Sequence, residues 1–185
     1  LDNLFISKES RAAIDRIVSN KIIESNAYAN RYIRGLVISP LGTTLENHYE
    51  QKQLKILSSG DNILGIILSN ISSGDNDLYN MMIYGSKGKP NQMTEMMGVR
   101  GVVTLEGKRM PKLFSYGRCS TFFPRYAMDP ISRGYVRDPL TEGFGPETMA
   151  YSAQSARQML VQKSQSTALT GANQRKHIKN MENAI

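Results

Sequence analysis

The first third of the chain places its apolar residues at helical spacing. Over residues 7–33, Ile14, Val18 and Ile22 fall on one face with Ile17 beside them, while most of the charged residues lie elsewhere. This periodicity predicts an amphipathic helix.

A second helix is expected after the Pro-Leu-Gly sequence at 40–42. Thr43 and Glu46 have the spacing of a capping box, in which the threonine accepts from the third helical amide and the glutamate reaches back. Gly60 would end this helix, whose apolar stripe consists of Leu45, Tyr49 and Ile56. Two helices joined by a short loop form an antiparallel hairpin, which we interpret as a structural element.

Shorter helices follow the hairpin. Residues 61–72 are mostly apolar and predict a third helix that stops at Ser-Ser-Gly, and Asp75-Asn76-Asp77 is typical of a helix start. The next helix breaks at residues 85–88, and Pro90 opens another that runs to Met97. Helical spacing makes the methionines of these helices filler of a core or an interface; they are Met81, Met82, Met93, Met96 and Met97.

The last two segments differ from the first. Residues 98–138 are interrupted by Gly, Pro and Arg, which predicts loops with small strands such as 102–105 and 122–123. Residues 147–182 contain no proline and predict one long helix, with a thin apolar stripe of Met149, Ala153, Ala156 and Leu160. Because this helix is basic and weakly amphipathic, we expect it to need partners on several sides.

Composition narrows the function classes. The 185 residues are 40% hydrophobic, which argues against disorder, and no apolar run is long enough to span a membrane. No signal peptide is visible. The single cysteine, Cys119, excludes a disulfide framework and a Cys-rich zinc site, and it suits a reducing compartment. The first residue is leucine, so we expect a processed piece or a segment of a larger protein.

The net charge of +7, from 23 Lys and Arg against 16 Asp and Glu, favours a polyanion as partner. A ribosome-like protein or a merely soluble basic protein is equally compatible with this charge. The usual catalytic constellations do not occur: His48 and His177 lie far apart, and no His/Cys/Asp cluster has metal-ligand spacing. We interpret His177 as a solvated or nucleic-acid-facing side chain. A self-contained hydrolase or metalloenzyme is therefore not expected.

One short motif could bind phosphate. In Gly85-Ser86-Lys87-Gly88 the two glycines allow backbone amides and one ammonium to converge on an anion, although the spacing is not that of a Walker A loop. By itself the tetrapeptide is more typical of a turn that breaks a helix. Arg100, Lys108 and Arg109 add positive charge to the following stretch, where a solvated basic loop is the simpler interpretation.

Taken in order, several motifs resemble the funnel, pore and bridge helix in the largest subunit of multisubunit DNA-dependent RNA polymerases. The similarity covers about residues 75–182. The matching residues are Met81-x3-Gly85-Ser86-Lys87-Gly88, Gln92-Met93, Gly98, Glu106-Gly107-Lys108-Arg109, Ser132-Arg133-Gly134-Tyr135-Val136, Pro146, Ala153, Arg157, Leu160, Thr167-Ala168, Thr170-Gly171, Gln174-Arg175, Lys179 and Glu182.

The resemblance implies site residues in two places. Lys87 matches the pore lysine that approaches the triphosphate of the incoming nucleotide, so the candidate nucleotide and pore residues are Gly85, Ser86, Lys87, Gly88, Arg100, Lys108 and Arg109. The candidate template and bridge-helix residues are Arg157, Thr167, Ala168, Thr170, Gly171, Gln174, Arg175 and Lys176. Thr167, Ala168 and Gly171 would pack against the templating base pair and permit bending, and the basic residues would face phosphates or acidic neighbouring subunits.

The resemblance also implies what this chain lacks. The family usually has an acid at position 169 and a tyrosine at 172, where Leu169 and Ala172 stand. The aspartate loop that binds the catalytic Mg²⁺ does not occur in the sequence, so no catalytic residue and no metal ligand is assigned here. The chain alone would be inactive. Val99-Arg100-Gly101 resembles the bacterial version while other motifs look eukaryotic, archaeal or viral, so a divergent enzyme of a large DNA virus or giant phage is expected.

We therefore predict a mainly α segment with a helical hairpin, short helices, a loop-rich part with small strands and a long C-terminal bridge helix. Its expected parts are a funnel-like hairpin with a third helix (1–74), a pore region (75–145) and the bridge helix (146–185). The implied partners are other polymerase subunits including the second-largest, DNA template, RNA transcript and NTPs, with no membrane, in the nucleus or cytoplasm. The alternative is a non-catalytic basic helical protein that binds RNA or a protein partner.

Overall fold

The structure is a computed structural model that describes residues 4–58, 63–71 and 76–182. The predicted helix end at Gly60 and the stop at residues 72–74 lie outside the described residues. Of the helix start predicted at residues 75–77, only Asp75 lies outside them. The start is confirmed, because the Asn76 side chain accepts from the Leu78 and Tyr79 amides, both at 3.1 Å, and caps the helix that begins at Asp77. The helices are α1 (Lys8–Ile33), α2 (Leu45–Ser58), α3 (Ile63–Asn70), α4 (Asp77–Ile83), α5 (Pro90–Met93) and α6 (Pro146–Glu182). The prediction of a mainly α fold is confirmed.

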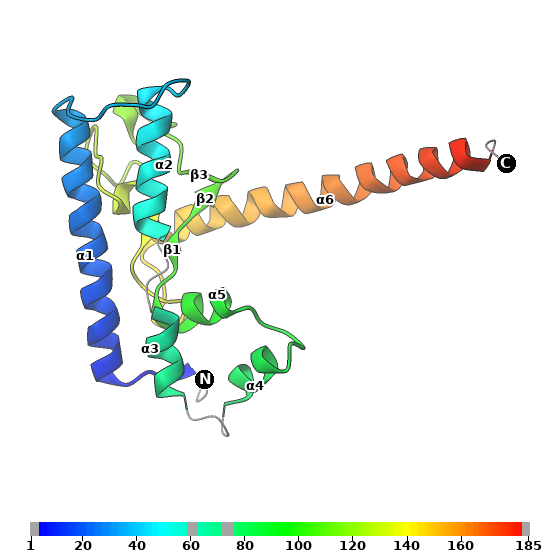
Figure 1. The fold of residues 1–185 in the computed structure, drawn as a ribbon, viewed down its shortest axis with the longest axis horizontal. Helices are drawn as coiled ribbons and strands as arrows, with labels where there is room; N and C mark the ends of the chain where they lie inside the picture. Colours follow the sequence, from blue (N-terminus) through cyan, green and yellow to red (C-terminus); the bar gives the residue numbers. More distant parts are fainter. Residues whose placement is uncertain (1–3, 59–62, 72–75, 183–185) are drawn as a thin grey trace.

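Helices α1 and α2 form the predicted antiparallel hairpin (Figure 1). The Ser7 side chain caps α1 by accepting from the Ser10 amide at 3.3 Å. The capping box predicted at Thr43 is wrong by one residue, because it is the Thr44 hydroxyl that accepts from an amide, that of Asn47 at 3.3 Å. Thr43 instead donates to the Pro40 carbonyl at 3.0 Å, which closes the preceding turn.

Buried polar and aromatic contacts join the two helices. The Gln53 amide, fully buried on α2, donates to the Ser25 carbonyl at 2.9 Å and accepts from the Ser25 hydroxyl at 2.5 Å. Tyr49 stacks on Tyr28 and Tyr32, with ring centroids 5.8 and 4.2 Å apart. Because the hydrogen bonds of Gln53 can form in only one alignment of the two helices, they fix the register of the hairpin.

The core lies where α1, α3 and α5 meet. Ile14, Ile67, Met93 and Met97 pack together there and are almost completely buried. After α5 the chain continues as one turn of π-helix, η2 (Thr94–Gly98), which packs closely on α3. The prediction that the methionines fill a core is confirmed for Met93 and Met97.

Two minimal sheets follow the core helices. β1 (Gly101–Val102) pairs antiparallel with β4 (Tyr135–Val136), and β2 (Thr104–Leu105) pairs antiparallel with β3 (Lys108–Arg109). Glu106 and Gly107 join β2 to β3 with φ values of 52° and 75°, the left-handed pair that a two-residue hairpin requires. The strand predicted at residues 122–123 is wrong, because this segment forms turns.

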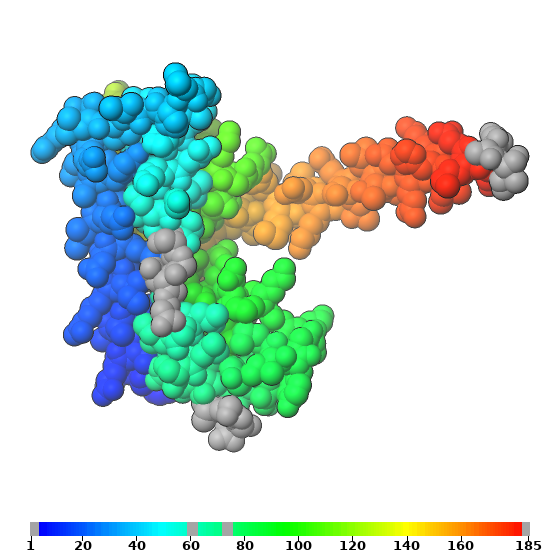
Figure 2. Space-filling view, in the orientation of Figure 1, coloured from blue at the N-terminus to red at the C-terminus, as the bar shows by residue number. Residues whose placement is uncertain are grey.

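Helix α6 projects from the rest of the molecule as a single arm (Figures 1 and 2). Its 37 residues span about 55 Å, and every described residue after Gln158 is exposed. The thin apolar stripe is exposed, since Met149 is 57% and Leu160 is 70% exposed and both alanines of the stripe are exposed as well. The buried residues are Thr148 and Tyr151, because only the first turns of the helix meet the compact part.

Candidate functional site

The pore motif forms an exposed turn after α4. Gly85 and Gly88 both have left-handed backbone angles, with φ of 67° and 91°. The amides of Gly85, Ser86 and Lys87 point back at the helix end: the first donates to the Met82 carbonyl at 3.2 Å, and the other two donate to the Met81 carbonyl at 3.2 and 3.5 Å. These three amides are thus occupied within the turn. This agrees with the simpler interpretation of a turn that breaks a helix, in which the two glycines turn the chain and cap the helix.

The Lys87 side chain is accessible to a ligand. It is exposed, and within the described ranges no ion pair involves its ammonium group. Lys108, on β3, is likewise exposed. Arg100 is half-buried and pairs with Glu95 of η2 at 2.7 Å. The motif thus presents one exposed cation on a hydrogen-bonded turn.

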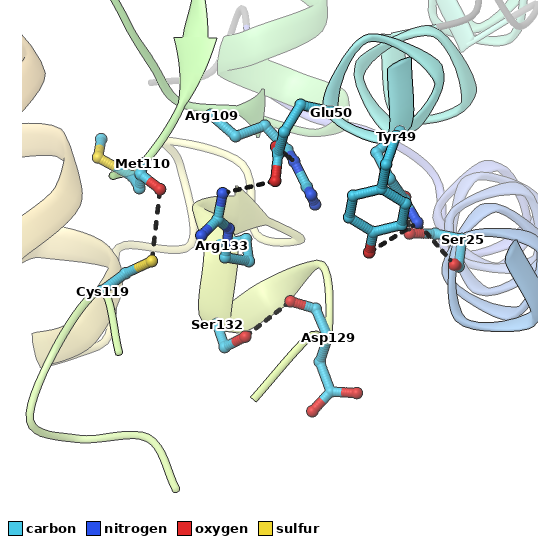
Figure 3. A network of polar contacts seen from close by, with 10 residues as sticks. Ser25, Tyr49, Glu50, Arg109, Met110, Cys119, Asp129, Ser132 and Arg133 are labelled. Atoms are coloured by element: carbon cyan, nitrogen blue, oxygen red, sulfur yellow. Dashed lines mark hydrogen bonds and ion pairs between the residues drawn. The ribbon is translucent and has the colours of Figure 1, made fainter. Parts of the chain in front are cut away.

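Arg109 is not the solvated residue that the sequence suggested. Its side chain is 1% exposed and donates from Nε to Glu50 Oε2 at 2.6 Å, while Arg133 donates from Nη2 to Glu50 Oε1 at 2.8 Å (Figure 3). The Arg109 guanidinium also lies over the ring of Tyr49, 5.5 Å from its centroid. This cluster ties α2 to β3 and to the turn before β4.

The cluster places two guanidinium groups on one carboxylate. Burial by itself would raise the pKa of Glu50, but hydrogen bonds and charge from Arg109 and Arg133 outweigh it and hold the pKa below its ordinary value. Three buried nitrogens have no hydrogen-bond partner among the described residues, namely Arg109 Nη1, Arg133 Nε and Arg133 Nη1. Glu50 is therefore indispensable to the charge balance of this part of the core.

Residues 132–136 carry a second structural role. Gly134 has φ of 91°, and a Cβ there would lie 2.8 Å from Met110 Cγ. The Tyr151 hydroxyl of α6 donates to the Ser132 carbonyl at 2.8 Å, and Ser155 donates to the Thr104 carbonyl at 3.2 Å. These contacts fix the base of α6 on the small sheets, so the direction of the arm is set by hydrogen bonds.

The candidate residues of α6 all lie on its exposed part, but not on one face. Thr167, Thr170, Gly171 and Gln174 recur at the spacing i, i+3, i+4, i+7 and share one stripe. Ala168 and the two arginines, Arg157 and Arg175, flank this stripe on one side, and Lys176 lies on the opposite side of the helix. A Cβ on Gly171 would meet nothing within 4 Å, so the glycine is not required by packing in this chain.

Sequence reasoning missed Glu50 and Gln53 as organising residues. They look like ordinary surface positions of an amphipathic helix, and their partners lie 28 to 83 residues away. No group of three His, Cys, Asp or Glu side chains that could hold a metal occurs among the described residues, so these do not fit a magnesium site. Among the same residues, no helix has the length and apolarity that a membrane span needs.

Most of the chain matches a known protein family. Residues 29–136, which run from the second half of α1 to β4, match the family described as RNA polymerase Rpb1, domain 4. The chain belongs to this family. The predicted recognition of a largest-subunit segment is thereby confirmed. The matched residues comprise the end of α1, all of α2, the short helices of the core and both small sheets.

Full-length relatives extend the similarity to α6. The chain is 27% identical over 183 residues to proteins named "DNA-directed RNA polymerase RPB1 homolog" from African swine fever virus isolates of a South African tick, a Namibian warthog and a Kenyan pig. The alignment covers 99% of this chain and 13% of each relative. The chain thus spans about an eighth of the length of these relatives, and their viral source agrees with the expected divergent, viral type.

Proposed function

We propose that this segment supplies the pore and the bridge helix of a template-directed RNA polymerase. The observation that carries the proposal is α6, a helix of 37 residues whose last 24 residues are all exposed in the described structure. A basic helix of this length gains little from folding alone, because most helical stability comes from packing. Its rigid base and free arm suit a strut across a cleft formed by other parts of the enzyme.

The two candidate sites have different roles in this proposal. The stripe of Thr167, Thr170, Gly171 and Gln174 would lie beside the templating base pair, and the flanking arginines would contact phosphates, which positions the strands without reading sequence. Lys87, at the tip of its turn, would approach the triphosphate of the incoming NTP and stabilise charge that develops during transfer. Arg109 and Arg133 hold the scaffold and do not contact the nucleotide.

The remaining parts of the active centre would come from elsewhere. The proposed enzyme contains the second-largest subunit and other segments of the largest subunit, and these would bind Mg²⁺. DNA template, RNA transcript and NTPs are its proposed partners, with a location in the nucleus or the cytoplasm.

Substitution of Lys87 in the assembled polymerase tests the nucleotide contact. Lys87→Ala should raise the apparent KM for NTPs about tenfold or more, because a charge-assisted contact worth about 1.5–3 kcal/mol is lost. Lys87→Arg keeps the positive charge, so its apparent KM for NTPs should rise less than that of Lys87→Ala. Lys89→Ala, two residues away and also exposed, is the matched control. Unchanged single-nucleotide addition in Lys87→Ala would refute the contact.

Native mass measurement of the assembly tests the wider proposal. We expect a complex that contains this chain, a second-largest polymerase subunit and the segment with the magnesium-binding aspartates. Recovery of the chain with RNA but without such a subunit would favour a non-catalytic RNA-binding protein instead.

A further inference from the structure

The segment between β3 and the turn before β4 exposes an unusual number of aromatic rings. We call residues 112–126 the aromatic loop. Its exposed fractions are 42% for Phe114, 46% for Tyr116, 60% for Phe122 and 70% for Tyr126. Surface rings of this density usually meet a partner, and nothing in the Lys87 or α6 sites uses them.

Two of these rings are held at a conformational cost. Tyr116 and Tyr126 have φ of 62° and 56°, a left-handed backbone that side chains other than Gly and Asn seldom adopt. The Tyr126 amide donates to the Tyr116 carbonyl at 3.0 Å, and the two rings meet edge to face with centroids 6.2 Å apart. Since neither ring is buried, packing in the core does not offset the cost of this backbone conformation. Strained backbone at exposed residues indicates a functional role.

Buried and stacking contacts hold the aromatic loop against the rest of the molecule. Cys119 is buried, and its thiol donates to the Met110 carbonyl at 3.3 Å (Figure 3). Phe123 stacks on Tyr151 of α6 with ring centroids 6.2 Å apart. Phe114 and Arg118 form a bridge in which the Phe114 amide donates to the Arg118 carbonyl at 3.0 Å. The exposed rings therefore stand on a fixed platform connected to the base of the arm.

The charge of the aromatic loop has one sign. It contains Lys112, Arg118 and Arg125 and no acidic residue, and no acid occurs between Glu106 and Asp129. The guanidinium of Arg125 lies 4.0 Å from the centroid of the Tyr116 ring. Rings alternating with arginine, without acids, match the chemistry of a stacking platform for unpaired bases, in which the cations follow the phosphates.

We propose that the aromatic loop binds an unpaired strand of nucleic acid by stacking bases on Tyr126 and Phe122 beside the cations. A protein partner would be matched less well, because a surface free of acids cannot pair with basic side chains and favours a uniformly anionic ligand. This inference depends on the proposed function in one respect: an RNA polymerase would supply the unpaired strand, either as the RNA transcript or as displaced DNA. Stacking chemistry is shared by both.

Photo-crosslinking in the assembled polymerase tests this proposal. A benzoylphenylalanine replaces Phe122, and elongation complexes carry a label in the RNA or in either DNA strand in separate arms. We expect a crosslink to one labelled strand. The same replacement at Ile23, 66% exposed on α1, is the control and should give none. Crosslinks at Phe122 to protein subunits alone would overturn the proposal and identify a subunit interface.

Two variants of Tyr126 separate stacking from structure. Tyr126→Asn keeps a residue that tolerates the left-handed backbone but removes the ring, and it should lower the crosslink yield at Phe122 about tenfold. Tyr126→Phe keeps the ring and should leave the yield unchanged. Equal yields in the two variants would contradict stacking. If the complex makes RNA but the crosslinks reach only protein, nucleic-acid binding by the aromatic loop is refuted and the proposed function is not. If the complex makes no RNA, the proposed function is refuted.

Discussion

Glu50→Gln perturbs the charge balance of the core with little change of shape. Glu50 accepts through both oxygens, at 2.6 Å from Arg109 and at 2.8 Å from Arg133. A glutamine carbonyl can accept only on one side and carries no charge. The variant therefore leaves two guanidinium groups, whose side chains are 1% and 6% exposed, without a counter-charge.

The expected cost is about 3 kcal/mol of the free energy of unfolding. Removal of one partner from a buried ion pair costs about 3–5 kcal/mol, and we expect the lower end because the Glu50 side chain is 21% exposed. With a urea dependence of about 1–3 kcal/mol per molar, the unfolding midpoint should fall by about 1–3 M. Tyrosine fluorescence is a suitable signal, since the chain has nine tyrosines and no tryptophan and Tyr49 borders the cluster.

Glu142→Gln is the matched control. Glu142 pairs with Arg11 at 3.1 Å, but the two side chains are 53% and 21% exposed, so the loss should be about 0–1 kcal/mol. A Glu50→Gln variant that loses no more than this control would refute the claim that the cluster joins the hairpin to the sheets.

Three further predictions follow from glycine geometry and from the Glu50 pKa. Gly171→Ala adds about 1 kcal/mol of helix propensity without a steric clash, so pausing or translocation of the assembled enzyme should change. Asn173→Ala gains less helix propensity and should have a smaller effect. Gly134→Ala should destabilise the chain by about 2–3 kcal/mol, because its Cβ would lie 2.8 Å from Met110 Cγ at φ of 91°; Gly143→Ala, at a similar φ with open space, should cost about 1 kcal/mol in the same urea titration. Because the pKa of Glu50 lies below 4.5 in the folded chain, its contribution to stability is present above that pH and is lost as the pH falls further; acid titration of Glu50→Gln should lack this loss.

Local patterns predicted the helices well. The spacing of Ile14 and Val18 located α1, and the lack of proline after Pro146 located α6, because both signals depend on residues within a few turns. The same patterns did not show which residues attach α6 to the rest of the molecule. Its orientation depends on Tyr151, which donates to the Ser132 carbonyl, and a hydrogen bond of this kind has no periodic signature.

The candidate site was predictable only in part. Resemblance drew attention to Lys87 and Arg109 alike, yet the structure exposes Lys87 and buries Arg109. The difference lies in Glu50, which is 59 residues from Arg109 along the chain and pairs with it only after the hairpin has packed on the sheets. A contact between residues so far apart cannot be derived from composition or spacing within one segment.

The central claim is that α6 lies beside the template in an active polymerase, and a crosslink from Ala168 tests it most directly. Ala168 is exposed at the edge of the stripe formed by Thr167 and Gly171, so a photo-crosslinking residue there reaches whatever the helix faces. In an elongation complex with labelled template, we expect a crosslink to the template next to the RNA 3′ end that moves as the RNA is extended. Crosslinks to protein alone, or to nucleic acid at a position independent of RNA length, would contradict it.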